Sequence, residues 1–556
     1  MIELLSPAGS MACLKAAVSK GADAVYLGMN KFSARDYAVN FNESYLSEAV
    51  KICKSNNVKL YLTMNTLVKN QELNPFFNQL SFAYSKGIDS VIIQETSFVD
   101  LIKKSFPDLR VHVSTQAGVM NSSHANLLSK ADRITLAREL TSNEIKNIRK
   151  NFKKELEIFC HGALCSSISG QCLFSSFLGG RSGNRGKCAQ PCRKKYNNQY
   201  LISTKELCLA SEIPEIIKLN VNSIKIEGRM RSPYYVAAAT ETYRKAIDSY
   251  YKGNFKIDAK KLFQVFNREF TKGWFKESKD IFNPRDSSAK TKISNEIYNV
   301  VIKNIKVNRS NIKANFPEFK KISSGKKLLV RVYSKEDAFK ASNSGADIVF
   351  FDILDEDFEK IKISSKLYGV TPRIVLDKDI EIISKRIKES NSEGLLIGNL
   401  AFLNLNLPKY LDYNLNNFND IDLSKIKDSK AIISPELSLN ELNDFNNKDF
   451  AVLVHGKIRL MTLRHNLTPG IIRDNKGEFY IKKIYNGSEI VNGKELGLLS
   501  KSQQLLSKGI NQFYIDTEND VENIVKLYRD ILDGKKVKDR NIKKNYVIGW
   551  AYKRVM

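Results

Sequence analysis

The sequence predicts an α/β protein with a TIM-type (β/α)8 barrel at its N-terminus, a small linking domain, and a second, degenerate barrel-like repeat. Two observations predict this fold. Short apolar runs alternate with helical spacings through the first 250 residues, and the same rhythm resumes after residue 324. Several segments of the first half also recur in the second half in the same order, as an internal duplication would produce.

The first half contains eight apolar runs of strand length. Such runs are typical of strands buried on both faces of a parallel sheet, and eight of them close into a TIM-type barrel. They cover residues 2–8, 24–28, 59–65, 90–94, 110–116, 133–138, 156–162 and 223–228. The 60 residues between the last two runs contain a cluster of four cysteines, at residues 165–192, and a fifth, Cys208. This loop is expected at the barrel mouth, where the loops after the strands carry the chemistry.

The second half repeats the pattern with runs at residues 326–333, 347–352, 373–377, 394–399, 411–415, 431–436, 451–456 and 512–516. GADAVYLG recurs as GADIVFFD, ITLARELTSNEI as AIISPELSLNEL, and EIFCHGALC as AVLVHGKIRL. After the shared His-Gly the first copy reaches Cys165, whereas the second has Arg459, and no cysteine occurs after Cys208. We therefore expect one cysteine site, in the first barrel, and basic residues facing a partner in the second.

The break in rhythm predicts four segments. The first barrel covers residues 1–253, the linking domain 254–323, the second barrel-like repeat 324–535 and a basic tail 536–556.

Composition predicts a multidomain, cytoplasmic protein that does not span a membrane. A chain of 556 residues with 42% hydrophobic content is long enough for two or more cores. No segment offers about 18 consecutive apolar residues, and the N-terminus lacks the pattern of a secretory signal. The net charge of +28 favours a polyanionic partner such as RNA, although a Lys-rich composition also arises from an AT-rich genome.

The cysteine motif is the most specific signal. Cys165, Cys172, Cys188 and Cys192 follow the spacing C-x6-C-x15-C-x3-C. Four thiolates satisfy the ligand count of a tetrahedral zinc or of a cubane iron–sulfur cluster. The long gaps favour a cluster, with zinc or unligated thiols as the alternatives. Cys13, Cys53, Cys160 and Cys208 are expected in the core.

A basic loop surrounds the later cysteines and includes Arg181, Arg185 and Arg193. It is expected to bind RNA phosphates or a small dicarboxylate through bidentate arginine contacts, the alternative being a solvated basic loop.

Polar residues also gather at the predicted strand ends, which converge on one mouth in a barrel. Asn65, Gln116 and Arg138 are predicted to bind substrate, and His161, Glu227 and Arg229 are predicted to be catalytic. A structural role is the alternative for each of them, and the usual hydrolase motifs are missing.

At these residues the chain resembles the collagenase-like peptidase family U-32. The resemblance rests on LLSPAGS, GADAVYLG, STQAGVMN, the long cysteine segment and KIEGRMRSPYYVA, and it extends over essentially the whole chain. The cysteine segment is similar to that of the ribosomal RNA 5-hydroxycytidine branch.

The resemblance implies a four-iron four-sulfur cluster on Cys165, Cys172, Cys188 and Cys192. It also implies prephenate-linked hydroxylation of a cytidine in large-subunit ribosomal RNA. Hydroxylation of the tRNA wobble uridine, peptidase activity and a non-catalytic RNA-binding role are the alternatives.

Overall fold

The structure of the protein is a computed structural model that describes residues 1–266, 268–283, 296–307, 309–426, 428–475, 477–537, 546–549 and 555–556. The chain folds into two compact units. Unit 1 contains residues 1–68, 72–170 and 182–316, and unit 2 contains residues 69–71, 171–181 and 317–556. The predicted linking domain and basic tail both include residues outside the described ranges, and residues 254–316 belong to unit 1.

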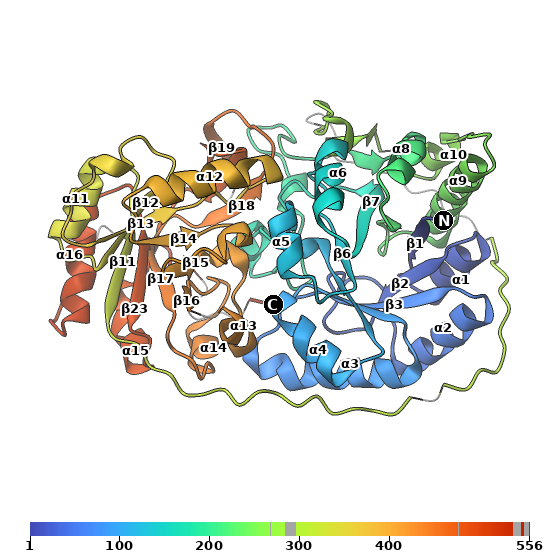
Figure 1. The fold of residues 1–556 in the computed structure, drawn as a ribbon, viewed down its shortest axis with the longest axis horizontal. Coiled ribbons are helices and arrows are strands. Elements are labelled where there is room, and N and C mark those ends of the chain that lie inside the picture. The colour runs from blue at the N-terminus through green and yellow to red at the C-terminus, as the bar shows by residue number, and fades with distance from the viewer. Residues whose placement is uncertain are drawn as a thin grey trace. The chain divides into compact units, whose positions relative to one another are not determined.

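Unit 1 is built on a closed barrel of eight parallel strands (Figure 1). All eight predicted runs contain a strand, which confirms the predicted barrel. The ring closes because the last strand pairs in parallel with both β7 and β1. The strands are β1 (Glu3–Pro7), β2 (Ala24–Gly28), β3 (Lys59–Met64), β4 (Ser90–Ile93), β5 (Arg110–Val113), β6 (Arg133–Thr135), β7 (Glu155–Ala163) and β9 (Ser223–Ile226).

Helices follow most of these strands and cover the outside of the barrel (Figure 1). Several begin at a side chain that accepts from the first-turn backbone, among them Ser10, Asn42 and Ser232, and Thr141 forms a capping box with Glu144. The helices are α1 (Met11–Ser19), α2 (Glu43–Ser55), α3 (Leu73–Lys86), α4 (Val99–Ser105), α5 (Ser122–Leu127), α6 (Ser142–Asn151), α8 (Ile213–Lys218), α9 (Pro233–Tyr251) and α10 (Lys260–Val265).

The interior of the first barrel holds a buried ion network. The Arg133 guanidinium contacts Glu3 at 2.5 Å and Glu157 at 3.2 Å, and Lys225 contacts Glu157 at 3.1 Å. Arg133 is 2% exposed, so these charges depend on one another for compensation. Burial would raise the pKa of Glu3, but Arg133 and Lys59 lower it to about 2.

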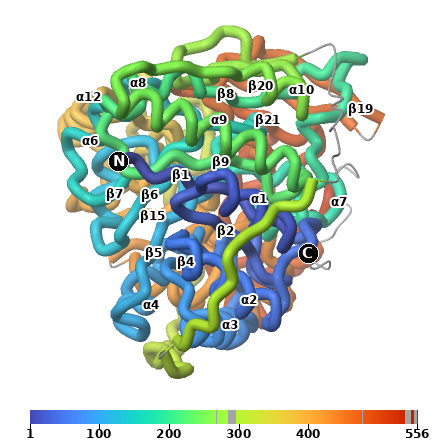
Figure 2. Tube along the Cα trace, turned by 90° about the vertical axis from the view of Figure 1, so that its right-hand side faces the viewer, coloured from blue at the N-terminus to red at the C-terminus, as the bar shows by residue number. Residues whose placement is uncertain are grey.

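Two short strands extend the sheet beyond the ring. β8 (Glu206–Cys208) runs antiparallel to β7, and β10 (Phe270–Thr271) pairs in parallel with β8. Residues 296–307 and 309–316 run along the outside of α2 and α3 (Figure 2). Their backbone donates to Ser55 and Ser81 at 2.8 Å each.

Unit 2 contains a second ring of eight parallel strands. Between β16 and β17 the ring closes through a parallel bridge of Ile432 with Ala451, and β23 pairs with both β17 and β11. The strands are β11 (Lys327–Arg331), β12 (Ile348–Asp352), β13 (Lys366–Val370), β14 (Gly394–Ile397), β15 (Lys409–Leu411), β16 (Ser429–Ala431), β17 (Ala451–Gly456) and β23 (Gln512–Asp516).

The strand predicted at residues 373–377 is wrong, because the third strand of this ring is β13. Ile374 and Val375 are buried, yet they follow Pro372, which lacks a backbone N–H, and lead directly into α12 (Asp377–Glu389). The run predicted at residues 411–415 overlaps β15 only at Leu411 and continues as a 3-10 turn, Tyr413–Leu415.

Further elements complete unit 2. An antiparallel sheet of β18 (Arg459–Leu463), β19 (Gly470–Asp474), β20 (Gly477–Ile484) and β21 (Gly487–Asn492) follows β17, and β22 (Leu496–Gly497) pairs with β17. The remaining helices are α7 (Phe174–Gly179), α11 (Lys335–Asn343), α13 (Asp420–Lys425), α14 (Leu439–Asn443), α15 (Ser502–Ser507) and α16 (Val521–Leu532). Within the described ranges, no helix combines the length and the apolar character needed to cross a membrane.

A charged group and three thiols at the mouth of the first barrel

Glu227 follows β9 directly and lies at the mouth of the first barrel. Its Oε1 accepts hydrogen bonds from Arg35 Nε at 3.2 Å and from Arg35 Nη2 at 3.1 Å. Burial would raise the pKa of this carboxyl, but Arg35, Arg138 and Arg229 together lower it. Glu227 is therefore ionised and sits among three arginines.

Arg229 ties together the loops after the first strands. Its guanidinium donates to Thr63 Oγ1 at 3.0 Å and also to Ser33 and Asn40. Burial lowers the pKa of Arg229 to about 10, and its Nε has no hydrogen-bond partner. Because its donors face protein oxygens, Arg229 positions the mouth and leaves little of its guanidinium for a ligand.

The predicted substrate-binding residues Asn65, Gln116 and Arg138 take part in local networks. Asn65 donates to Gln116 at 2.9 Å, and Gln116 donates to Gln94 at 3.1 Å. Arg138 donates to the Ala163 carbonyl and to Ser169 Oγ, both at 2.7 Å. The structure thus fixes all three side chains around the same strand ends, and their role in binding stays a prediction.

Three of the four predicted cysteine ligands, Cys165, Cys188 and Cys192, belong to unit 1. Burial raises the pKa of the Cys165 thiol, and a negative charge on Cys188 raises it further. Burial also raises the pKa of Cys192 to about 12, with contributions from Cys165 and Cys188. The Gln190 N–H donates to Cys188 Sγ at 3.3 Å.

The fourth cysteine, Cys172, belongs to unit 2, where it forms a bridge with Met461. Its predicted role as a ligand is not tested by the structure. Among the described residues, no group of three or more His, Cys, Asp or Glu side chains is arranged to hold a metal ion.

The cysteine trio adjoins the charged group. Arg138 donates to the carbonyl of Ala163, two residues before Cys165. The Asp36 N–H, next to Arg35, donates at 3.3 Å to the carbonyl of Gly186, two residues before Cys188. Thiols and charged side chains thus form one continuous site, which we call the first mouth.

His161 has a different environment from the other predicted catalytic residues. Its ring packs among Tyr235, Tyr243 and Phe270 at centroid distances of 5.8, 5.5 and 5.6 Å. Burial, with a smaller effect of Arg231, lowers the pKa of His161 to about 3, so the ring is neutral. Within the described part of the chain, its Nδ1 has no hydrogen-bond partner, and its catalytic role stays a prediction.

The predicted basic loop is partly neutralised. Arg185 forms a bidentate ion pair with Glu72 at 2.7 and 2.8 Å, and Arg193 donates to Ser203 at 3.0 Å and to the Thr204 carbonyl. Arg181 belongs to unit 2. The loop contains no acidic residue, and the acid that pairs with Arg185, Glu72, comes from a distant segment of the chain.

Sequence reasoning missed Arg35, the main partner of Glu227. Arg35 lies in the long loop after β2, which also contributes Ser33 and Asn40. A long polar loop at the C-terminal end of a barrel strand was the available signal.

A charged, thiol-bearing group at the carboxyl ends of barrel strands is the arrangement of a (β/α)8 enzyme. The profile of peptidase family U32 matches residues 9–283, and the chain belongs to this family. The match covers the first barrel and its cysteine loop. It does not include the second half, over which the resemblance was also expected to extend.

Three curated relatives share this region. An uncharacterized protease of Methanocaldococcus jannaschii is 42% identical over 50% of this chain and 73% of its own length. The tRNA hydroxylation protein P1 of Bacillus subtilis is 33% identical over 45% of this chain and 63% of its own length. A 23S rRNA 5-hydroxycytidine synthase of Escherichia coli is 35% identical over 45% of this chain, but the match spans only 39% of that protein.

Proposed function

We propose that this protein is an iron–sulfur-dependent RNA hydroxylase that forms a 5-hydroxypyrimidine, with 5-hydroxycytidine in large-subunit ribosomal RNA as the first candidate product. The observation that carries the proposal is the first mouth, where the loop that bears Cys165, Cys188 and Cys192 is hydrogen-bonded to Arg138 and to the segment of Arg35, the partner of Glu227. Two relatives named for RNA hydroxylation support the same chemistry. Hydroxylation of the tRNA wobble uridine is the second candidate.

Cys165, Cys188 and Cys192 would hold a four-iron four-sulfur cluster, with Cys172 as the predicted fourth ligand. When bound, such a cluster supplies one-electron transfer at a potential set by its surroundings. The Gln190 N–H that already points at Cys188 Sγ stabilises a thiolate there. Arg138 adds a positive charge beside Cys165, which favours its deprotonation.

Glu227 suits recognition of a cytosine. Both hydrogen bonds from Arg35 end on Oε1, so Oε2 remains open to a donor. A carboxylate accepts from the cytosine N4 amino group, which uracil lacks. The ionised Glu227 therefore favours cytidine over uridine as the target.

RNA would reach the first mouth with the target base exposed. A base inside a helix cannot enter a barrel mouth, so a loop or a flipped nucleotide is the expected substrate. The net charge of +28 attracts the RNA backbone. A small dicarboxylate, prephenate, is the proposed co-substrate, and Arg35, whose side chain is 36% exposed, is the cation of the first mouth that would face it.

Mass spectrometry of ribosomal RNA and tRNA nucleosides tests the proposal. A strain lacking this gene should lose one hydroxylated pyrimidine, and the wild-type gene should restore it. Cys188→Ser should fail to restore it, whereas Cys13→Ser, in the core helix α1, should succeed. An unchanged nucleoside profile in the deletion strain would refute RNA hydroxylation.

The cluster is tested separately on protein purified without oxygen. Iron, acid-labile sulfide and a broad absorption near 400 nm are expected. Peptidase activity is the competing outcome. Cleavage of gelatin that survives replacement of Cys165, Cys172, Cys188 and Cys192 but not metal chelation would favour it.

A further inference from the structure

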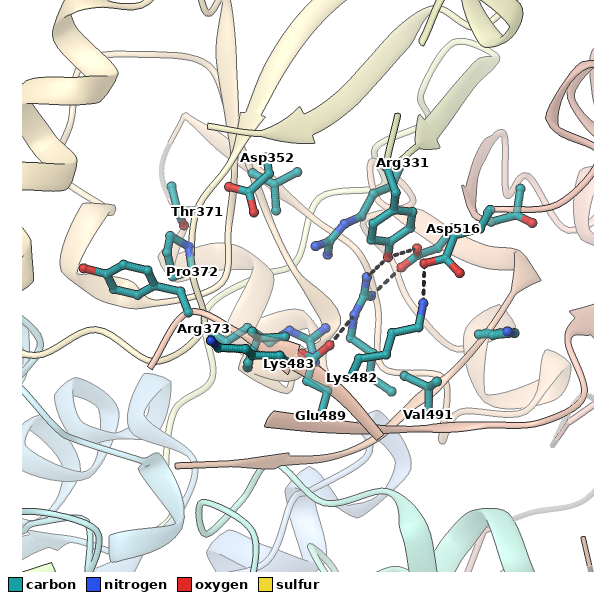
Figure 3. A pocket seen from close by; sticks show the side chains of 18 residues that line it. Arg331, Asp352, Thr371, Pro372, Arg373, Lys482, Lys483, Glu489, Val491 and Asp516 are labelled. Atoms are coloured by element: carbon teal, nitrogen blue, oxygen red, sulfur yellow. Dashed lines mark hydrogen bonds and ion pairs between the residues drawn. The ribbon is translucent and has the colours of Figure 1, made fainter. Parts of the chain in front are cut away.

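A pocket opens at the mouth of the second barrel. Its volume is about 310 Å³, and it lies at the carboxyl ends of β11, β12, β13 and β23, beside the antiparallel sheet that follows β17 (Figure 3). Ligands of barrel proteins bind at this end of the strands. The volume is at the low end of the range for small-molecule sites, roughly 300–1,000 Å³, and is far too small for a folded macromolecule.

Buried ion pairs build the wall of this pocket. Arg459 contacts Glu489 at 3.1 Å and also Asp516, while Tyr333 donates to Asp516 at 2.6 Å. Arg373 contacts Asp412 at 2.7 Å and Glu489 at 3.4 Å. These side chains hold one another in place, so the wall is fixed before any ligand arrives.

Three other cations that line the pocket, Arg331, Lys457 and Lys483, take no part in these ion pairs. In the described part of the chain, no carboxylate pairs with Arg331, Lys457 or Lys483. The Arg331 guanidinium carbon lies 5.3 Å from the centroid of the Tyr333 ring, and Lys457 Nζ lies 4.3 Å from the centroid of the Tyr480 ring. Figure 3 shows Arg331, Asp352 and Lys483 around the same opening.

One acidic residue, Asp352, lies among these unpaired cations of the pocket. It also lines the pocket and accepts from the Leu354 N–H at 3.0 Å through Oδ1. The pocket therefore offers an excess of positive charge together with one carboxylate that can accept a hydrogen bond.

The internal repeat indicates that these charges belong to the second barrel alone. Leu5 pairs with Ala24 as Leu329 pairs with Ile348, so the two rings can be compared position by position. In this alignment Arg331 takes the place of Pro7, and Asp352 takes the place of Gly28. The ring of unit 1 closes with Pro7 and Gly28 at these two positions. A closed barrel therefore does not require charged residues there.

We propose that this pocket binds a small organic anion through a carboxylate or phosphate group held by Arg331, with Lys457 and Lys483 alongside. A guanidinium without a protein acceptor is suited to bidentate recognition of either oxyanion. Asp352 would accept from a hydroxyl or amino group on the same ligand. The proposal does not depend on the chemistry assigned to the first mouth.

Isothermal titration of the full chain tests it, with four probes: inorganic phosphate, ribose 5-phosphate, acetate and malate. Binding of ribose 5-phosphate or malate is expected, and the stronger of the two identifies the oxyanion. Arg331→Gln should weaken this binding by about tenfold or more, since a charge-assisted hydrogen bond is lost. Asp352→Asn should weaken the hydroxylated probe but not its simple counterpart, phosphate or acetate.

The matched control is Arg473→Gln, which alters an exposed arginine on the same antiparallel sheet. It should bind like the wild type, and thermal unfolding should show that both variants are folded. Three outcomes would overturn the proposal: no binding of any probe to the wild type, equal binding by Arg331→Gln, or loss of affinity for an RNA oligonucleotide alone. The last would assign Arg331 to an RNA backbone contact.

Discussion

The two barrels share a scaffold but differ at their mouths. Glu227 and Asp516 occupy equivalent positions, because His161 pairs with Ile226 as His455 pairs with Ile515. In the first barrel the carboxylate contacts Arg35 and lies near cysteines, whereas Asp516 is enclosed by Arg459 and Tyr333. The same carboxylate position therefore serves an open, thiol-bearing site in one ring and the wall of a cationic pocket in the other.

The interiors differ as well. Lys225 of the buried ion network corresponds to Tyr514 in unit 2, where Phe350 packs against Tyr410 and Tyr514 at centroid distances of 5.9 and 6.0 Å. The first ring combines a buried ion network with Tyr26 and Tyr61, whereas the second places a further aromatic ring, Tyr514, where the first has Lys225. A duplicated barrel thus keeps its strands while the residues that fill its centre change.

The largest expected effect is the loss of bound iron when a cysteine of the first mouth is replaced. Cys165→Ser or Cys188→Ser should abolish bound iron and the hydroxylated nucleoside, because each removes a thiolate of the first mouth. Arg331→Gln in the second barrel should leave the iron content unchanged. Iron and sulfide assays on protein purified without oxygen check both statements. Full iron in Cys165→Ser would remove that residue from the ligand set.

The next largest effect concerns the wall of the pocket in the second barrel. Asp516→Asn should destabilise unit 2 by about 3 kcal/mol, because it leaves the buried Arg459 guanidinium short of negative charge. Urea denaturation followed by circular dichroism measures the loss. Glu518→Gln is the control, since Glu518 forms a more exposed pair with Lys482 and should cost less than about 1 kcal/mol. Similar losses in both variants would contradict this reading of the pocket wall.

Acid should destabilise the first barrel through Glu3. The folded pKa of Glu3 is about 2, below its ordinary 4.5, so its stabilisation is complete above pH 4.5 and is lost as the pH falls towards 2. The loss is roughly 3 kcal/mol. Hydrogen exchange read by mass spectrometry should show β1 and β6 opening more readily as the pH falls through this window. In Glu3→Gln the opening of these strands should change less with pH, and an equal pH dependence in the variant and the wild type would disprove the role of Glu3.

The smallest expected effect is common to both barrels. Gly162 and Gly456 have φ values of +101° and +120°, and an added Cβ would lie 2.4 Å from the Glu227 carbonyl oxygen and 1.8 Å from that of Asp516. Alanine at either position should destabilise its own unit by about 2 kcal/mol. Thermal unfolding of both variants tests this, with Gly179→Ala, whose methyl meets open space, as the control. An effect in one barrel only would show that the two turns are not equivalent.

The fold was largely predictable because buried parallel strands are continuous apolar runs. All eight runs of unit 1 contain a strand, from β1 to β9. The error at residues 373–377 has a physical cause. β13 contains Gly369, against which Ile353 packs so closely that a side chain would clash, and such a strand has a weak apolar signal. The buried Ile374 and Val375 beyond it gave a stronger one.

The site was predictable only in part. Cysteine spacing identified Cys165, Cys188 and Cys192, and strand ends identified Glu227 and Arg229. Pairing between distant segments was not visible, so Arg35 was missed.

Long-range pairing also changes the expectation for two predicted residues. Glu72, 113 positions from Arg185, engages that guanidinium, and Arg193 is held by Ser203 and Thr204. The sequence shows which charges a loop carries but not which acids or carbonyl groups the fold brings to them.

The division of the chain between the units constrains how such a protein can be shortened. Residues 69–71 and 171–181 leave the first half of the sequence to become part of unit 2, where Phe174 packs on Phe479 at 4.8 Å and Lys69 contacts Glu441 at 2.7 Å. A chain truncated after residue 316 would therefore contain these two segments without the part of unit 2 on which they pack. The boundary between the two units therefore does not coincide with any single cut in the sequence.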